Sequence, residues 1–135
     1  MVLLQLLKYL WTLPNTLLGL LCVPLAVLSG GKVQWVRGIV EIHGRAIGWL
    51  LQRRIPVIGG VYAVTIGHVV LGRDGAALTR LRDHEHVHVR QYERWGPFFI
   101  PAYFLASLLA HLKGGDAYRD NVFERAAYGK GRDVA

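Results

Sequence analysis

The sequence predicts an α+β protein with hydrophobic helices that associate with a membrane. Its core is expected to be a small β-sheet packed on a helix with a His-Glu-x-x-His motif and on a C-terminal helix that contains Glu124. Three observations support this: the motif at residues 84–88, β-branched runs at residues 33–43 and 61–71, and uncharged apolar runs at residues 10–28 and 95–112. We divide the chain into a hydrophobic membrane-associated segment, residues 1–28, and one domain, residues 29–135.

Composition favours a lipid partner over a nucleic-acid partner. The chain of 135 residues is 53% hydrophobic and 19% charged, and its net charge is +7. Apolar content this high in a small protein indicates a part that faces lipid. The arginines are scattered and form no nucleic-acid motif, so we expect a lipid bilayer and no nucleic acid. Cys22 is the only cysteine, which excludes an internal disulfide.

The N-terminal apolar segment is long enough to cross a bilayer. Residues 10–28 carry no charge, and about 20 apolar residues span the hydrocarbon core. We expect a membrane helix or a re-entrant hairpin here, with a buried soluble helix and a cleaved signal peptide as alternatives. Basic residues follow the segment, whereas only Lys8 precedes it. The positive-inside rule therefore places the rest of the chain, and any catalytic part, on the cytoplasmic side.

Two stretches after the turn at Gly30 have strand composition. Residues 33–43 predict one strand with a bulge at Gly38, and residues 61–71 predict a second that contains His68. Residues 46–52 fit a short helix or another strand. The second strand is expected either inside the sheet or at an edge that can pair with an extended peptide. His68 is then either a structural histidine or a residue that polarises a substrate.

The His-Glu-x-x-His motif lies in residues 79–95, where good helix formers predominate. Thr79 is the expected N-cap, and Gly96-Pro97 is expected to end the helix. Residues four apart share one helical face, so His84 and His88 can both direct a nitrogen at one metal ion. Glu85 borders that face and can accept a proton from water. The alternatives are a polar surface helix, or a strand with three alternating histidines on one face.

Two further helices are expected after the motif. Residues 95–112 carry no Lys, Arg, Asp or Glu, and their length is borderline for a membrane span. They form a segment that dips into the membrane interface or packs against the first apolar segment, or else a soluble core helix. Residues 116–128 read as the last helix, capped by Asp120 or Asn121 and ended by Gly129. Zn²⁺ held by two histidines needs a third protein ligand. The candidates downstream are His111, Asp116, Asp120 and Glu124.

Residues 60–128 resemble the gluzincin metallopeptidases, most of all their minimal forms. The residues that carry the resemblance are His84-Glu85-x-x-His88-x-x-Gln91-Tyr92-Glu93, an apolar segment, and Tyr118-Arg119-Asp120-Asn121-x-Phe123-Glu124-x-x-Ala127-Tyr128. The resemblance implies a zinc-dependent peptidase that cleaves a peptide or protein substrate. In it, His84, His88 and Glu124 bind Zn²⁺, and Glu85 is the general base for metal-bound water.

Other roles follow less directly. Tyr128 or His68 is expected to stabilise the oxyanion, and Asp120 to orient a ligand histidine. His86 departs from the family, which has an aliphatic or small residue there, and it lies about 200° from His84 around the helix. Two alternatives to the peptidase stay open. One is a non-catalytic membrane protein with a structural zinc site, and the other is a basic adaptor at the membrane surface with no metal.

Overall fold

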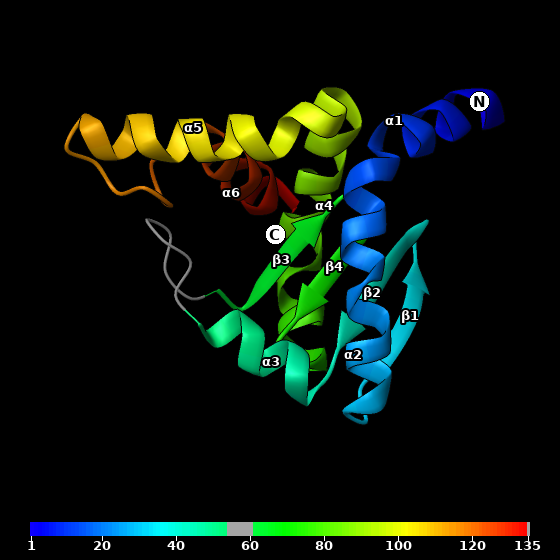
Figure 1. Ribbon diagram of the computed structural model, residues 1–135. Coiled ribbons are helices and arrows are strands. Elements are labelled where there is room, and N and C mark those ends of the chain that lie inside the picture. The colour runs from blue at the N-terminus through cyan, green and yellow to red at the C-terminus, as the bar shows by residue number, and fades with distance from the viewer. Residues whose placement is uncertain (54–60, 135) are drawn as a thin grey trace.

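A computed structural model describes residues 1–53 and 61–134, and it shows an α+β fold. The sheet is mixed, with strand order β1-β2-β4-β3 (Figure 1). β1 pairs antiparallel with β2, β2 parallel with β4, and β4 antiparallel with β3. The edge strands are therefore β1 and β3. The strands span Lys32–Val36 (β1), Ile39–His43 (β2), Ala63–Ile66 (β3) and Val69–Gly72 (β4).

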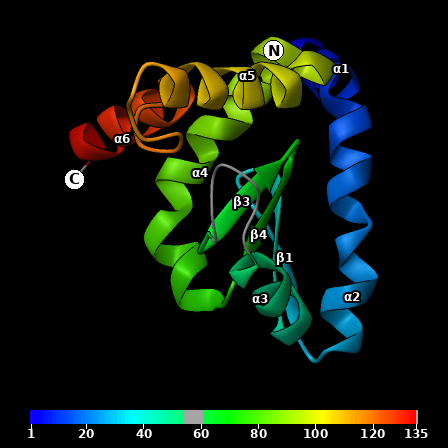
Figure 2. The same cartoon turned by 60° about the vertical axis from the view of Figure 1, so that its left-hand side comes forward.

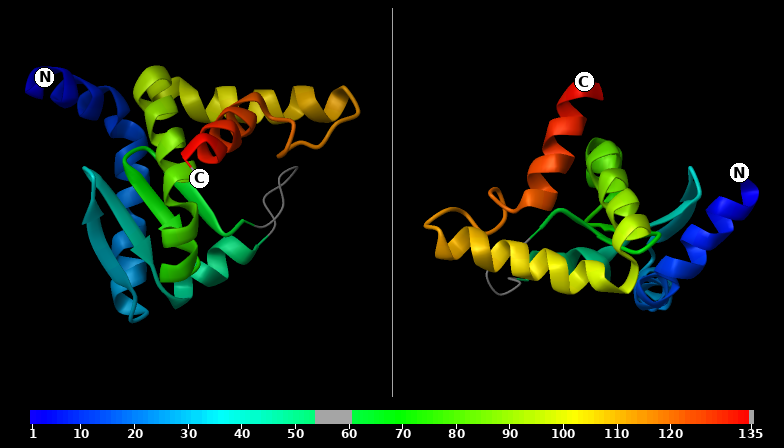
Figure 3. Two further views of the ribbon diagram at one scale, coloured as in Figure 1. Left: turned by 180° about the vertical axis from the view of Figure 1, so that it is seen from behind. Right: turned by 90° about the horizontal axis from the view of Figure 1, so that it is seen from above.

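Helices cover both faces of the sheet (Figure 2). The first pair, α1 (Val2–Leu20) and α2 (Cys22–Leu28), lies on one face, and α4 (Gly75–Trp95) lies on the other with α6 (Val122–Val134) beside it. A short 3-10 helix, η1 (Gly96–Phe98), turns the chain from α4 into α5 (Phe99–Leu112). Seen from above and from behind, α5 extends away from the end of α4 (Figure 3).

Each of the two predicted strands is in fact a hairpin. Residues 33–43 form β1 and β2 around Arg37-Gly38, whose φ angles are 54° and 80°. Positive φ at both central residues fits a tight hairpin turn, so the predicted bulge at Gly38 is wrong. Residues 61–71 form β3 and β4 around Gly67, at φ 67°, and His68. A glycine at the first central position allows this turn, which places His68 between the strands.

The helix boundaries also differ from the prediction. Residues 46–52, which fitted either element, belong to helix α3 (Arg45–Gln52). Helix α4 begins at Gly75, one turn before Thr79, because the Asp74 carboxylate accepts the Ala77 N–H at 2.7 Å. It ends at Trp95, as predicted. Helix α6 begins after Asn121, whose side chain accepts the Phe123 N–H, and continues past Gly129.

Helix α1 is attached to the domain by polar contacts on its inner face. The Thr12 hydroxyl donates to Tyr92 O at 3.3 Å, and the Asn15 amide donates to Gly96 O at 2.8 Å. Gly19 allows the closest approach, because a Cβ there would lie 2.7 Å from the Val69 Cβ. By length and composition alone, Val2–Leu28 and Gly75–Leu112 are each apolar enough to cross a membrane.

Substituting Gly19 tests the close packing of α1 on the sheet. Gly19→Ala places a methyl group 2.7 Å from the Val69 Cβ, and overpacking of this kind outweighs the gain in helix propensity. We expect a loss of about 1–2 kcal/mol of stability in urea unfolding. Gly129→Ala is the matched control in a helix, where the added Cβ meets no atom within 4 Å. It should leave stability unchanged or raise it slightly. Equal effects would contradict the close contact.

Candidate metal centre

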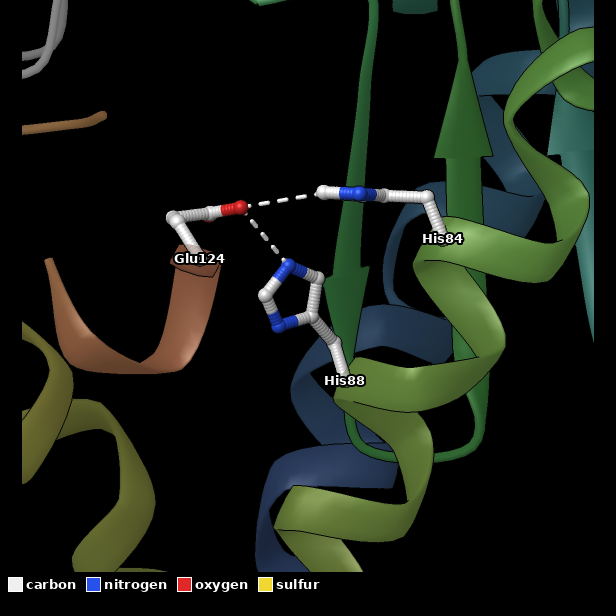
Figure 4. A group of neighbouring side chains, drawn as sticks. All are labelled: His84, His88 and Glu124. Atoms are coloured by element: carbon white, nitrogen blue, oxygen red, sulfur yellow. Dashed lines mark hydrogen bonds and ion pairs between the residues drawn. The ribbon is translucent and has the colours of Figure 1, made fainter. Parts of the chain in front are cut away.

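Helix α4 buries polar side chains on more than one face. His84, Glu85, His86 and His88 are all buried, although helices of soluble domains normally bury apolar residues. His84 and His88 lie one turn apart, with ring centroids 5.0 Å from each other in an edge-on arrangement. Both imidazoles point toward Glu124 on α6 (Figure 4). One face of α4 therefore presents two imidazoles at the same place.

Glu124, on α6, points at this pair of imidazoles (Figure 4). Its Oε1 lies 3.0 Å from Nε2 of His84 and 3.0 Å from Nε2 of His88. One ligand atom from each of the three residues falls within 4.8 Å of the others, and all three side chains are buried. Residues 36 to 40 positions apart in the chain thus converge on one point.

Neighbouring side chains fix the orientation of these groups. His88 Nδ1 lies 2.8 Å from Gln91 Oε1, and the Gln91 amide donates to Phe123 O on α6. An amide oxygen only accepts hydrogen bonds, so Nδ1 carries the proton and the Nε2 lone pair of neutral His88 is free for a metal. From α5, the Tyr103 hydroxyl donates to Glu124 Oε2 at 2.6 Å, which leaves Oε1 directed at the histidines.

The charges of the three residues support one another. Burial alone would raise the pKa of Glu124, but the hydrogen bonds from His84 and His88 hold it at about 2. Burial likewise favours neutral His88, yet the bond to Glu124 and the charge of Glu85 raise the His88 pKa to about 9. Without metal, hydrogen bonds between the two imidazoles and the Glu124 carboxylate hold the group together. A bound cation would replace these hydrogen bonds and release their protons.

Glu85 lies beside the cluster without belonging to it. It is buried, and the Thr65 hydroxyl on β3 donates to its Oε2 at 2.8 Å. Burial raises the pKa of Glu85, while nearby His88 and His84 lower it in part. A carboxyl group whose pKa is raised by burial accepts a proton more readily than an exposed one, which suits a role in proton transfer.

A cavity of about 210 Å³ opens next to Glu85. Glu85, His88 and Glu124 are its ionisable lining residues, and hydroxyl groups come from Thr65 and three tyrosines. The apolar part of the lining comes mainly from edge strand β3 and from α5. It includes Val64, Ile66, Phe99, Ile100 and Phe104. The arrangement joins a group able to hold a metal, a carboxylate able to carry a proton, and a space for an apolar side chain.

The other sequence candidates lie at different places. Tyr128 packs its ring 4.3 Å from the His84 ring, and its hydroxyl donates to the Tyr118 hydroxyl at 3.2 Å. His68 faces Glu93, with Nε2 and Oε2 2.8 Å apart, and does not line the cavity beside Glu85. Asp120 accepts the Asp116 N–H and so closes a turn. The structure therefore brings Tyr128 to the cluster and leaves His68 and Asp120 outside it.

His86 faces a second carboxylate on the opposite side of α4. Its Nε2 lies 3.2 Å from Glu41 Oε2, and Glu41 on β2 is completely buried. Arg82 binds both oxygens of Glu41, at 3.0 and 2.9 Å. These hydrogen bonds hold the pKa of Glu41 below its usual value, although burial acts in the opposite direction. His86 thus belongs to a structural ion cluster.

Three residues that orient the site were not assigned roles from the sequence. Gln91 lies three positions after His88 on the same helical face, so its spacing could have indicated a contact. Thr65 and Tyr103 lie on other elements, and no local pattern points to them.

His84, His88 and Glu124 form a group that can hold a metal ion, and two imidazoles with one carboxylate are a donor set found around zinc. No family model, curated protein or solved structure matches this chain.

Metal analysis of the protein purified without an affinity tag tests the site. We expect one equivalent of metal in the unsubstituted chain and none in His88→Ala. Gln91→Ala removes the partner of His88 Nδ1 and should weaken binding about 10–100-fold. His86→Gln is the control within the motif, because His86 faces Glu41 and a glutamine amide can donate to the same carboxylate, so this variant should retain the metal. Metal retained by His88→Ala but lost from His86→Gln would contradict the assignment.

Proposed function

We propose that this chain is a zinc-dependent metallopeptidase of the gluzincin type that acts at a membrane, on its cytoplasmic side. The observation that carries the proposal is the convergence of His84, His88 and Glu124 within 4.8 Å, with Glu85 buried beside them. Two histidines and a glutamate leave a fourth position of a tetrahedral zinc site open. The resemblance in residues 84–93 and 118–128 points to the same chemistry.

In the proposed reaction, Glu85 handles the proton. A bound Zn²⁺ would supply Lewis-acid activation of water and of the scissile carbonyl. The Glu85 carboxylate removes a proton from the attacking water and passes it to the nitrogen of the leaving amine, so that a carboxyl group and an amine are released. Thr65 holds the Glu85 carboxylate in position through its 2.8 Å hydrogen bond. Tyr128, next to His84, is the candidate donor to the oxyanion.

The position of β3 suggests how a substrate binds. β3 is an edge strand, packs against α4 and lines the cavity beside Glu85. An extended peptide that pairs with this edge would bring a backbone carbonyl toward the metal group, and a neighbouring apolar side chain would enter the cavity. We therefore propose a peptide or protein substrate with an apolar residue next to the cleaved bond.

A structural zinc site is the second candidate. The burial of all three ligands favours it, because closed sites hold metal for stability. The two candidates differ when the metal is removed. A chelator unfolds a protein that depends on structural zinc, whereas a catalytic site loses activity and keeps its fold. Circular dichroism and peptide hydrolysis measured on the same chelated sample distinguish them.

Removing the proposed base gives the most direct test of function. Glu85→Gln should abolish hydrolysis of a broad peptide library, because an amide cannot accept the proton. Metal content should stay the same, since Glu85 is not one of the three proposed ligands. Asp83→Asn is the matched control, an exposed carboxylate on the same helix, and should retain activity. Full activity in metal-loaded Glu85→Gln would refute the proposal.

Thr65 should control the pH dependence of the reaction. Its hydroxyl donates to ionised Glu85 and so lowers the pKa of that carboxyl group. Thr65→Val removes the bond and raises the pKa, and because the base must be ionised, the acidic limb of kcat/KM moves to higher pH. A bond to a charged group corresponds to a shift of about one unit. Thr79→Val, which removes an exposed hydroxyl on α4, should leave the profile unchanged. A shift to lower pH would contradict the role of Thr65.

A further inference from the structure

The outer faces of α1, α2 and α5 expose large apolar side chains. Helix α5 carries no Lys, Arg, Asp or Glu, and it is apolar on its exposed side as well as on its buried side. A helix that is apolar all round belongs in a protein core or in lipid. The exposed apolar residues on these helices include Leu3, Leu10, Leu17, Leu28, Leu108 and Leu112.

Helix α5 is too short to cross a bilayer. Its 14 residues rise about 21 Å at 1.5 Å per residue, whereas the hydrocarbon core is about 30 Å thick. It also cannot extend α4 into one long span, because Gly96 breaks the helix at φ 57°. Helix α4 itself carries exposed charges such as Arg80 and Asp83. One side of α5 contacts α4 and α6, and the other side exposes leucines. A helix packed on the domain in this way can bury its outer side in lipid when it lies parallel to the membrane plane.

Helices α1 and α2 are long enough to cross, but their packing opposes it. Thr12, Asn15 and Gly19 attach the inner face of α1 to the domain. A span by residues 2–28 would therefore draw the sheet into the hydrocarbon layer. The edge strand β1 is exposed and carries Lys32 and Gln34. An open sheet edge does not occur in contact with lipid, because each unpaired backbone group costs several kcal/mol there.

We infer that α1, α2 and α5 lie in the plane of one leaflet of an anionic phospholipid bilayer, without crossing it. Their exposed leucines enter the acyl region, and the remainder of the domain stays on one side of the membrane. Figure 1 shows α5 and the N-terminal half of α1 at one end of the sheet, with α2 toward the other end, and the view from above shows α5 and α1 on the same side of the sheet (Figure 3). If the proposed peptidase function holds, the cavity partly walled by α5 opens near the membrane surface.

The charge distribution indicates anionic lipid. Of the four glutamates, Glu41, Glu85 and Glu124 are buried, whereas arginines such as Arg90 and Arg94 are exposed. The surface is therefore more basic than the net charge of +7 alone implies. Basic residues also bracket the apolar α5, with Arg94 before it and Lys113 after it. Each basic residue near an anionic surface contributes attraction.

A polar cavity between α1 and α4 is suited to a lipid phosphate. Its volume is about 450 Å³, and Lys8, Arg37 and Arg90 line it together with Glu93. Lys8 also lies 4.0 Å from Glu93, and Arg37 lies 3.2 Å from Asp83 on the exposed surface, so a phosphate would compete for both side chains. His68 also lines it and is buried, and its Nδ1 atom has no hydrogen-bond partner among the residues that the structure describes. This cavity adjoins the N-terminal half of α1, where the exposed leucines begin. The apolar helices match the acyl chains of an anionic phospholipid, and the basic cavity beside them matches its phosphate.

Co-sedimentation of the full chain with vesicles tests the partner. The protein carries Glu85→Gln, so that binding is measured without hydrolysis. It should prefer vesicles of phosphatidylcholine and phosphatidylglycerol over phosphatidylcholine alone. Lys8→Gln and Arg90→Gln should each reduce that preference about fivefold. Arg125→Gln on α6 is the control and should have no effect. Equal affinity for both vesicles would overturn the anionic headgroup.

Two substitutions on α5 test the apolar contact. Leu108→Glu and Leu112→Glu alter exposed residues one turn apart, and each should weaken binding to both vesicles at least tenfold. Trp35→Glu on β1 is the control for adding a charge at an exposed apolar position. Gln at the same α5 positions replaces Glu if circular dichroism shows unfolding. Unchanged vesicle binding in both α5 variants would overturn the inference. A chain that forms a dimer through these leucines and does not bind vesicles would also overturn it, in favour of a second copy of the chain.

Cysteine labelling distinguishes the in-plane position from a span. In a Cys22→Ala chain, Arg94→Cys and Lys113→Cys mark the two ends of α5. Val2→Cys marks the start of α1, and Lys32→Cys, at an exposed position just after α2, marks the other end of that pair. A membrane-impermeant maleimide outside sealed vesicles should modify all four. Protection of one end of either pair until detergent is added would show a span and overturn the inference. Neither result depends on metal or peptidase activity.

Discussion

The cost of burying ionisable side chains is the constraint on which the rest of this structure depends. A buried charge without a partner destabilises a protein by several kcal/mol, so each one needs an opposite charge at short range. Helix α4 buries polar residues on two sides and meets a buried carboxylate on each. Glu41 on β2 binds Arg82 and His86, and Glu124 on α6 binds His84 and His88. The two glutamates thereby attach α4 to the sheet and to the last helix.

This arrangement also explains why only two of the three histidines in the motif face the candidate metal centre. Successive residues turn by about 100° around a helix, so His86 points away from the side shared by His84 and His88. Glu41 fixes that rotation, since it holds His86 and Arg82 against the sheet. With α4 held in this rotation, His84 and His88 can face only α6. A contact at the sheet thus determines the direction of the proposed ligands on the other side of the helix.

Local patterns in the sequence predicted some of this and missed the rest. One-turn spacing places His84 and His88 on one face, and Gly96-Pro97 marks the end of their helix, because both signals lie within a few residues. Each hairpin was mistaken for a single strand, since the β-branched composition continues through Gly38 and Gly67. The contacts of Thr65 with Glu85 and of Tyr103 with Glu124 join distant elements. No spacing rule encodes them, because they depend on how the sheet and α5 pack.

The high apolar content of the chain and the chemistry of its site are connected through α5. Tyr103 on this helix holds Glu124 in position, and Ile100 and Phe104 wall the cavity beside Glu85. Leucines on the same helix are exposed to the outside. A displacement of α5, for example when its apolar surroundings change, therefore moves Tyr103 and with it the Glu124 carboxylate that faces both histidines. In water, those exposed leucines favour any displacement that covers them, and the geometry of the site then depends on what α5 contacts.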